Sequence, residues 1–188
     1  AKQKCLDHID GHAQRFIELS PFLCIGTQTA DGRADVSPRG DPPGFARVAD
    51  AKTLMIPDRP GNNRLDTLSN IIANASVGLI FMVPGFDETL RINGVAKISC
   101  DPEHLAGFEV NERRPKVVIV VTVDEVFLHC AKAFRRSRLW DPSAQQDRAQ
   151  MPSLMKIVLD QTTGAPSEPG ALRALDESLE DEYRNTMY

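Results

Sequence analysis

The residues of this chain best suited to chemistry are the arginines and asparagines in the run from Ile56 to Leu68. The run follows a strand-like segment and opens a helix-like one. Free backbone N–H groups at a helix start attract anions, and arginine and asparagine side chains add further donors. The run therefore predicts a cradle for a phosphate group, with the candidate donors Arg59, Asn62, Asn63 and Arg64.

Two other polar groups lie on candidate strands. One ends an early strand and consists of Ser37, Pro38, Arg39 and Gly40. The other, Arg91 and Asn93, shares one face of an alternating segment. Asparagine amides and backbone N–H groups can form hydrogen bonds with the carbonyl and imide edges of a planar heterocycle. With the cradle, these residues predict a phosphate-bearing, ring-containing cofactor held on a β framework.

Composition restricts the class of protein. The chain has 188 residues, of which 41% are hydrophobic, and this fits one domain with additional segments. Its net charge of −4 argues against broad nucleic-acid binding. No apolar run is long enough to span a membrane, and the first twenty residues do not form a signal peptide, so we expect a cytoplasmic protein. The four cysteines match no zinc motif, and no metal site is expected.

The hydrophobic pattern is rich in short strands. We expect helices over 4–19 and 63–73, a short helix after Asp101, and tail helices over 152–162 and 171–183. Asp31-Gly32 favours a tight hairpin. Closely spaced strands with hairpin signals favour an antiparallel barrel over a doubly wound sheet. The expected strands cover 22–29, 33–37, 53–57, 77–83, 88–99 and 117–123, and segment 126–130 continues or restarts the last of these.

The sequence contains none of the common catalytic signatures. It has no phosphate-binding P-loop, no dinucleotide fingerprint, no H-E-x-x-H and no nucleophile elbow. His8 and His12 are spaced for a shared helix face, but no further ligand is placed beside them. We therefore nominate no catalytic residue.

Taken together, the motifs resemble the pyridoxamine 5′-phosphate oxidase-like flavoproteins of the FMN-binding split-barrel superfamily. The resemblance covers about residues 5–140. It depends on four segments of the sequence, 20–23, 31–45, 56–70 and 89–96. The second and third segments are specific to one branch of that superfamily.

The resemblance implies a mainly β fold with helices (α+β), a six-stranded antiparallel split barrel over 1–140 that forms a homodimer with FMN at the subunit interface. Residues 141–188 would form a helical extension packed on the barrel or the dimer. Asn63 and Arg64 would grip the FMN phosphate, and segment 37–40 would pass the ring and ribityl chain. Arg91 and Asn93 would approach the flavin from the barrel side. The basic-aromatic segment 133–140, with Arg135 and Trp140, would close the site from the partner subunit.

The function implied is that of an FMN-dependent oxidoreductase with a small-molecule electron donor and acceptor. The chain lacks the R-x-H element and the tryptophan-rich C-terminal stretch of true pyridoxamine phosphate oxidases, so its substrate stays unassigned. The alternatives are a deazaflavin-dependent reductase, a flavin- or haem-binding protein without turnover, and a structural dimer that has lost its cofactor. Haem would need an axial ligand, for which the candidates are His129 and the His8/His12 pair.

Overall fold

The structure is a computed structural model that describes residues 4–61 and 64–187. Asn62 and Asn63, two of the expected phosphate ligands, lie outside the described residues. The chain divides into two compact units, residues 1–141 and 142–188, and each is described by itself. None of the helices in the described ranges has the length and apolar character needed to cross a membrane.

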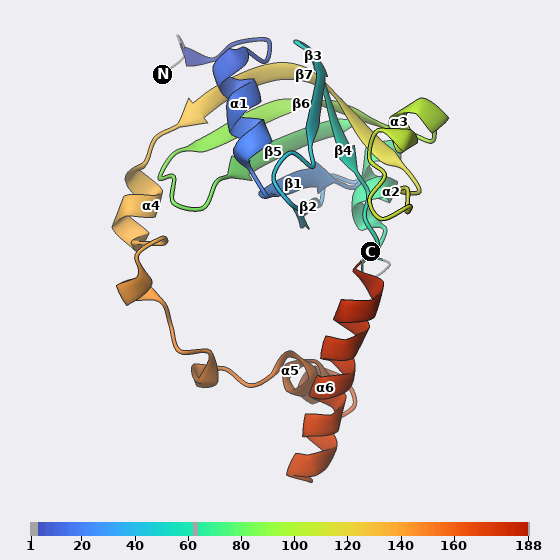
Figure 1. Cartoon of the computed structure of the whole chain (residues 1–188), viewed down its shortest axis with the longest axis vertical. Coiled ribbons are helices and arrows are strands. Elements are labelled where there is room, and N and C mark those ends of the chain that lie inside the picture. Colours follow the sequence, from blue (N-terminus) through green and yellow to red (C-terminus); the bar gives the residue numbers. More distant parts are fainter. Residues whose placement is uncertain (1–3, 62–63, 188) are drawn as a thin grey trace. The chain divides into compact units, whose positions relative to one another are not determined.

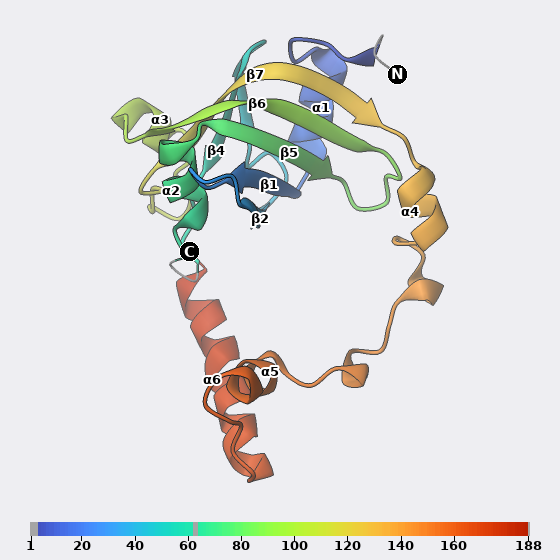
Figure 2. The same ribbon diagram turned by 180° about the vertical axis from the view of Figure 1, so that it is seen from behind.

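The first unit is a curved antiparallel sheet with four short helices (Figures 1 and 2). Its strands are β1 (Phe22–Gln28), β2 (Ala34–Gly40), β3 (Arg47–Asp50), β4 (Thr53–Pro57), β5 (Ser76–Met82), β6 (Thr89–Ser99) and β7 (Val118–His129). Its helices are α1 (Gly11–Leu19), α2 (Asp66–Ala73), α3 (Pro102–Ala106) and α4 (Lys132–Ser137).

The sheet has seven strands in the order β2-β1-β5-β6-β7-β4-β3, so the expectation of a six-stranded barrel was wrong. The additional strand is β3, which has four residues and only one half-buried position, and it therefore gave no alternating pattern in the sequence. It pairs with β4 across a short turn. No ladder joins β2 to β3 in the described part of the chain, so the sheet is not a closed barrel.

The main core lies on the inner face of the sheet. Alternate strand residues such as Leu23, Ile25 and Ile92 are fully buried there. Figure 1 shows α1 in front of the sheet, and α1 adds Ile17 to this core while α2 adds Ile71. These two helices therefore cover the same face.

The first helix is shorter than its expected span of 4–19. It begins at Gly11 because the Asp10 carboxylate accepts a hydrogen bond from the Ala13 N–H at 2.8 Å and caps the helix there. The residues before Asp10 do not continue the helix. Leu6 instead forms an antiparallel bridge with Val126 of β7.

The outer face of the sheet is covered only in part. Phe108, Val118 and Val120 form a second cluster against which Leu105 of α3 packs. Along β1, β5 and β6 the outer positions are only half-buried, as at Cys24 and Ile80. A β-bulge at Asn93/Gly94 separates the two regions. A Cβ at position 94 would lie 2.1 Å from the Thr122 carbonyl oxygen, which is too close, so the bulge requires glycine there.

The hairpin expected at Asp31-Gly32 is present. Gly32 has a φ of 85° and donates its N–H to the Thr29 carbonyl at 3.0 Å. Strand β2 then runs to Gly40, three residues further than expected, and pairs with β1 along its whole length. This extension places Arg39 and Gly40 in a strand whose side chains alternate between the two faces.

The second unit consists of two helices, α5 (Leu154–Gln161) and α6 (Pro169–Thr186), preceded by two short 3-10 turns. Ser153 caps α5 by accepting a hydrogen bond from the Lys156 N–H at 3.2 Å. The helices correspond to the two expected in the tail, and α6 extends three residues beyond the predicted end. None of the described residues of this unit is buried.

Candidate functional site

A cavity of about 610 Å³ opens beside the free edge of β2 and is called the basic cavity here. Segment 37–40 forms one wall, the segment after β4 forms the second, and residues 113–116 form the third. Six cationic side chains line it, and Asp58 is the only acidic residue among the described lining residues. The cationic residues are Arg39, Arg59, Arg64, Arg113, Arg114 and Lys116.

This concentration of positive charge contrasts with the net charge of −4 of the whole chain. A concave wall that carries one sign of charge focuses its field on an ion of the opposite sign. The cavity is also within the range of volumes that hold small ligands, roughly 300–1,000 Å³. It is therefore a candidate site for an anionic small molecule.

Arg39 supplies the clearest single donor. Its side chain is 15% exposed, and its Nη1 lies 2.5 Å from Oδ1 of Asp58, the residue that follows β4. Its Nε is buried and has no hydrogen-bond partner among the described residues. A buried donor without an acceptor costs about 1–3 kcal/mol. An anionic group that accepted a hydrogen bond from this atom would remove that cost.

Arg59 is held on two sides by the protein itself. Its Nε lies 2.8 Å from Oδ2 of Asp41, whose side chain is only 2% exposed, and its Nη1 donates to the Phe108 carbonyl at 2.8 Å. These contacts link the end of β2 to the segment after α3. Arg59 therefore braces the cavity wall and adds charge to it.

Arg64 lies at the start of α2 and is exposed. Its Nε is hydrogen-bonded to the carboxylate of Asp66 in the first helical turn, and this bond raises the pKa of the Arg64 guanidinium. Among the described residues no side chain caps the first turn of α2, since the N-cap residue is Leu65. The backbone donors of that turn therefore have no side-chain acceptor at the cap.

Sequence reasoning missed the third wall. Residues 110–113 form a tight turn in which Asn111 and Glu112 both have positive φ, 48° and 62°. Val110 and Arg113 close the turn with two backbone hydrogen bonds of 3.0 and 2.9 Å. The turn is followed by Arg114, Pro115 and Lys116, which run directly into β7. The available signal was three cations in the four residues from 113 to 116, just before an apolar strand.

The three cations of this wall differ in their partners. Arg114 pairs with Glu109, with Nε and Oε2 2.6 Å apart. Arg113 and Lys116 make no ion pair with any residue in the described ranges. Arg113 and Lys116 are therefore the rim charges most available to a ligand.

The neighbours of Arg39 on β2 also line the basic cavity. Ser37 lies on the same side of the strand as Arg39, whereas Pro38 and Gly40 lie on the other side. A Cβ at Gly40 would meet the Phe22 ring and the Pro21 carbonyl oxygen at 3.5 Å, which is ordinary contact. The fold therefore does not require glycine at position 40.

Arg91 and Asn93 do not line the basic cavity. They lie on the outer face of the sheet in a second cavity of about 410 Å³, the outer cavity, which also includes Cys24, Gly78 and His129. The Arg91 guanidinium lies 5.0 Å from the centre of the Phe127 ring. Asn93 donates from Nδ2 to the Glu125 carboxylate at 2.7 Å. Val36 lines this cavity, and Pro38, the next residue on the same side of β2, lines the basic cavity, so the two sites adjoin along β2.

Arg135 and Trp140 are held against the turn between β5 and β6. Arg135 Nε lies 2.9 Å from the Asp87 carboxylate, and Trp140 Nε1 donates to the Phe86 carbonyl at 2.7 Å. The Trp140 ring also packs on Phe134, with ring centres 5.6 Å apart. Neither Arg135 nor Trp140 lines the basic cavity.

The chain belongs to the pyridoxamine 5′-phosphate oxidase family, whose model matches residues 9–130. The match includes the whole sheet and all the residues of the basic cavity, and it ends before α4. No curated protein matches the chain. The family membership expected from the sequence is thus confirmed.

Among solved structures, the chain is similar to HupZ of Group A Streptococcus. The two are 19% identical, the alignment covers 64% of this chain and 93% of that one, and the TM-score is 0.52. General Stress Protein 26 of Bacillus anthracis is 14% identical, with 62% and 93% of the two chains covered and a TM-score of 0.46. At these identities the similarity to HupZ is a similarity of fold.

Proposed function

We propose that the chain is an FMN-dependent oxidoreductase that holds the FMN phosphate in the basic cavity. The observation that carries the proposal is Arg39, which lines a cavity together with five other cations and whose buried Nε has no hydrogen-bond partner among the described residues. The donors there are guanidinium and ammonium groups, which suit a phosphate dianion. The residues present therefore fit the phosphate end of this cofactor.

Each cationic residue of the basic cavity would contribute to FMN binding in a different way. Arg39 would supply a directed hydrogen bond, because Asp58 fixes its guanidinium through Nη1. Arg113 and Lys116 would attract the anion from solvent, and Arg64 would add charge at the start of α2. Arg59 would keep the wall in place through Asp41. When bound, FMN would supply the redox chemistry by taking up and returning a hydride equivalent.

We place the working site at the interface of a homodimer. The outer face of the sheet exposes Val36 and Val95, which are 67% and 44% exposed, and it carries the outer cavity next to the basic cavity. An apolar sheet face of this kind is suited to burial against a second subunit. Arg91 and Asn93 would then lie near the flavin, and Arg135 and Trp140 would reach the partner's site.

A deazaflavin also carries phosphate, and the basic cavity alone does not separate it from FMN. Haem fits less well, because no histidine is among the described residues that line the basic cavity. The outer cavity does include His129.

The experiment is to release the bound small molecule from the purified protein and identify it by mass spectrometry. Reconstitution of the stripped protein with FMN, with a deazaflavin and with haem follows, monitored by absorbance spectra. The proposal expects FMN to be released and rebound with a two-band flavin spectrum. Exclusive binding of the deazaflavin, or a Soret band from haem, would refute it.

A further inference from the structure

Taken by itself, the two-helix unit formed by residues 142–187 does not bury its apolar side chains. Its described residues include no buried one, and Met151, Leu154 and Tyr183 are 61%, 48% and 45% exposed. Soluble proteins seldom expose apolar residues as a connected group unless another surface covers them. The family model ends at residue 130, so its match does not account for this surface.

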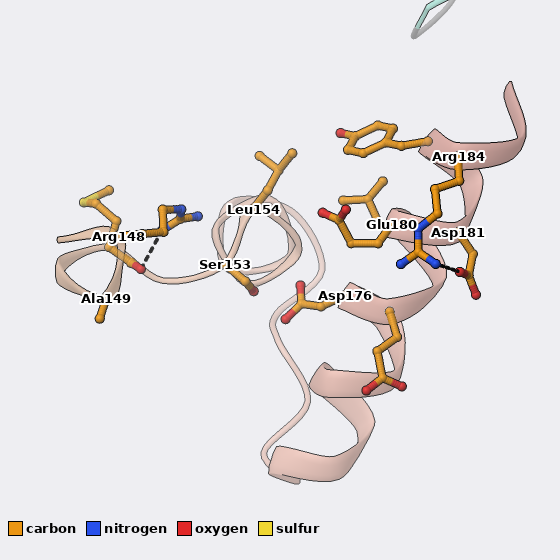
Figure 3. A pocket seen from close by; sticks show the side chains of 12 residues that line it. Arg148, Ala149, Ser153, Leu154, Asp176, Glu180, Asp181 and Arg184 are labelled. Carbon is orange, nitrogen blue, oxygen red and sulfur yellow. Dashed lines mark hydrogen bonds and ion pairs between the residues drawn. The ribbon is translucent and has the colours of Figure 1, made fainter. Parts of the chain in front are cut away.

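These side chains surround a groove of about 830 Å³ within the unit. Met151 and Leu154 line it on the side of α5, and Leu179 and Tyr183 line it from α6. Figure 3 shows Asp176 and Glu180 of α6 projecting toward the segment that carries Ser153 and Leu154. The groove therefore combines an apolar wall with carboxylates along one helix.

The charge of the groove is strongly negative. Asp176, Glu177, Glu180 and Asp181 line it, against two arginines, Arg148 and Arg184. Arg148 donates to the carbonyls of residues 151 and 152 at 2.8 and 3.0 Å, and Arg184 pairs with Asp181 at 3.3 Å.

Two of the carboxylates are available to a partner. Asp176 and Glu180, one helical turn apart, make no ion pair with any described residue. Residues 142–188 contain eight acidic and four basic residues, so the net charge of −4 of the whole chain belongs to this unit.

We propose that this groove binds a basic amphipathic helix of another protein. Leucine-like side chains of the partner would pack on Leu154, Leu179 and Tyr183, and its lysines or arginines would face Asp176 and Glu180. This is the helix-in-groove mode, in which apolar anchors recur at i, i+3, i+4 and i+7. A second copy of this unit is a poorer occupant, because it would bring acidic rims together.

The test uses the full chain and a fluorescent peptide of roughly 18 residues, made of lysine and of leucine at helical spacing. A matched peptide has glutamate in place of lysine. Fluorescence anisotropy should show binding of the lysine peptide, weakened by added salt, and at least about tenfold weaker binding of the glutamate peptide. Absence of binding, or equal affinity for the two peptides, would overturn the proposal.

Variants locate the binding surface. Glu180→Lys and the milder Asp176→Asn should each weaken binding of the lysine peptide. Glu182→Lys makes the same charge change on the same helix outside the groove and should have a much smaller effect. Circular dichroism checks that α6 remains helical in all three variants. Equal losses from Glu180→Lys and Glu182→Lys would show attraction by bulk charge alone and contradict the proposal.

A further measurement addresses a second copy as the occupant. Sedimentation of the full chain and of Leu179→Lys compares their oligomeric states. The proposal expects the two to be the same. If the full chain self-associates and Leu179→Lys abolishes this association, the groove binds a second copy of the chain. That result would overturn the assignment to a basic partner.

Discussion

The guanidinium of Arg39 and the carboxylate of Asp58 are 2.5 Å apart, although β1, β5, β6 and β7 lie between β2 and β4 in the sheet order. The contact shows that the curved sheet brings its two ends together at the basic cavity. It also fixes one side of the Arg39 guanidinium and leaves the buried Nε for another acceptor. The fold thus positions a hydrogen-bond donor that no described residue of the chain accepts from.

Arg39→Lys keeps the positive charge but removes Nε, so it separates directed hydrogen bonding from simple attraction. Hydrogen bonds to charged groups contribute roughly 1.5–3 kcal/mol, and we therefore expect FMN to bind about 10- to 100-fold more weakly. Quenching of FMN fluorescence during titration measures this change. Arg33→Lys, on the same hairpin but outside the cavity, is the control and should bind like the wild type. An Arg39→Lys affinity equal to that of the control would remove Arg39 from the site.

Asp41→Leu should destabilise the fold because it leaves the largely buried charge of Arg59 without its partner. Breaking a buried ion pair on one side costs about 3–5 kcal/mol, and replacing both partners by apolar residues can recover much of that loss. Urea unfolding of Asp41→Leu and of the double variant Asp41→Leu/Arg59→Met measures both effects. A single variant as stable as the wild type would show that the pair does not brace the wall.

Arg113 and Lys116 should attract FMN electrostatically from a distance, and this attraction should weaken as the salt concentration rises. Arg113→Gln and Lys116→Gln are expected to weaken FMN binding at low ionic strength, and the difference from the wild type should shrink as salt screens the charges. Arg114→Gln is the matched control, since Arg114 already pairs with Glu109 and should matter less. FMN titrations at two salt concentrations measure these differences in affinity. A loss of affinity in Arg114→Gln as large as in Arg113→Gln or Lys116→Gln would contradict the prediction.

Gly40→Val tests whether a larger side chain at position 40 of β2 interferes with FMN binding. The protein should fold, because a Cβ at this position makes only ordinary contacts and β-branched residues suit strands. Gly40 lines the basic cavity on the side of β2 opposite Arg39, and a valine side chain would crowd that part of the lining, so we expect less FMN to remain bound after gel filtration. The absorbance of flavin per subunit measures the loss. A folded variant with full flavin content would show that position 40 does not face the cofactor.

The N-terminal segment offers a pH-dependent contact outside the site. Hydrogen bonds from His8 and Lys52 lower the pKa of Asp7 from 3.8 to about 2. A carboxyl group with a lowered folded-state pKa stabilises the fold above its unfolded pKa and loses that effect as pH falls through the folded value. Asp7→Asn should therefore lower the melting temperature at pH 6, and its difference from the wild type should shrink as pH falls from about 4 through about 2. A difference that does not shrink over this range would contradict the assignment.

The sequence predicted the parts of the site that follow from short motifs. Asp31-Gly32 required a tight hairpin, and the hairpin places segment 37–40 antiparallel to β1. Arg59 and Arg64 line the same cavity as Arg39, and their role as an anion cradle stays a prediction. Local turn chemistry and arginine clusters can be read from sequence because they depend on neighbouring residues.

Features that depend on the whole sheet were not predicted. Strand β3 has too few buried positions to show a period, and it exists because β4 offers it a partner. Arg113 and Lys116 reach the cavity only because the turn at 110–113 redirects the chain before β7. Arg91 and Asn93 share a strand face, but the sheet register places them in the outer cavity, away from Arg39.

The central claim is that the basic cavity recognises the phosphate of the cofactor, and the most direct measurement compares FMN with riboflavin, which lacks that phosphate. Titrations of the stripped protein should give at least about tenfold tighter binding of FMN, and Arg39→Lys should remove most of the difference. Equal affinity of the wild-type protein for FMN and riboflavin would contradict the account.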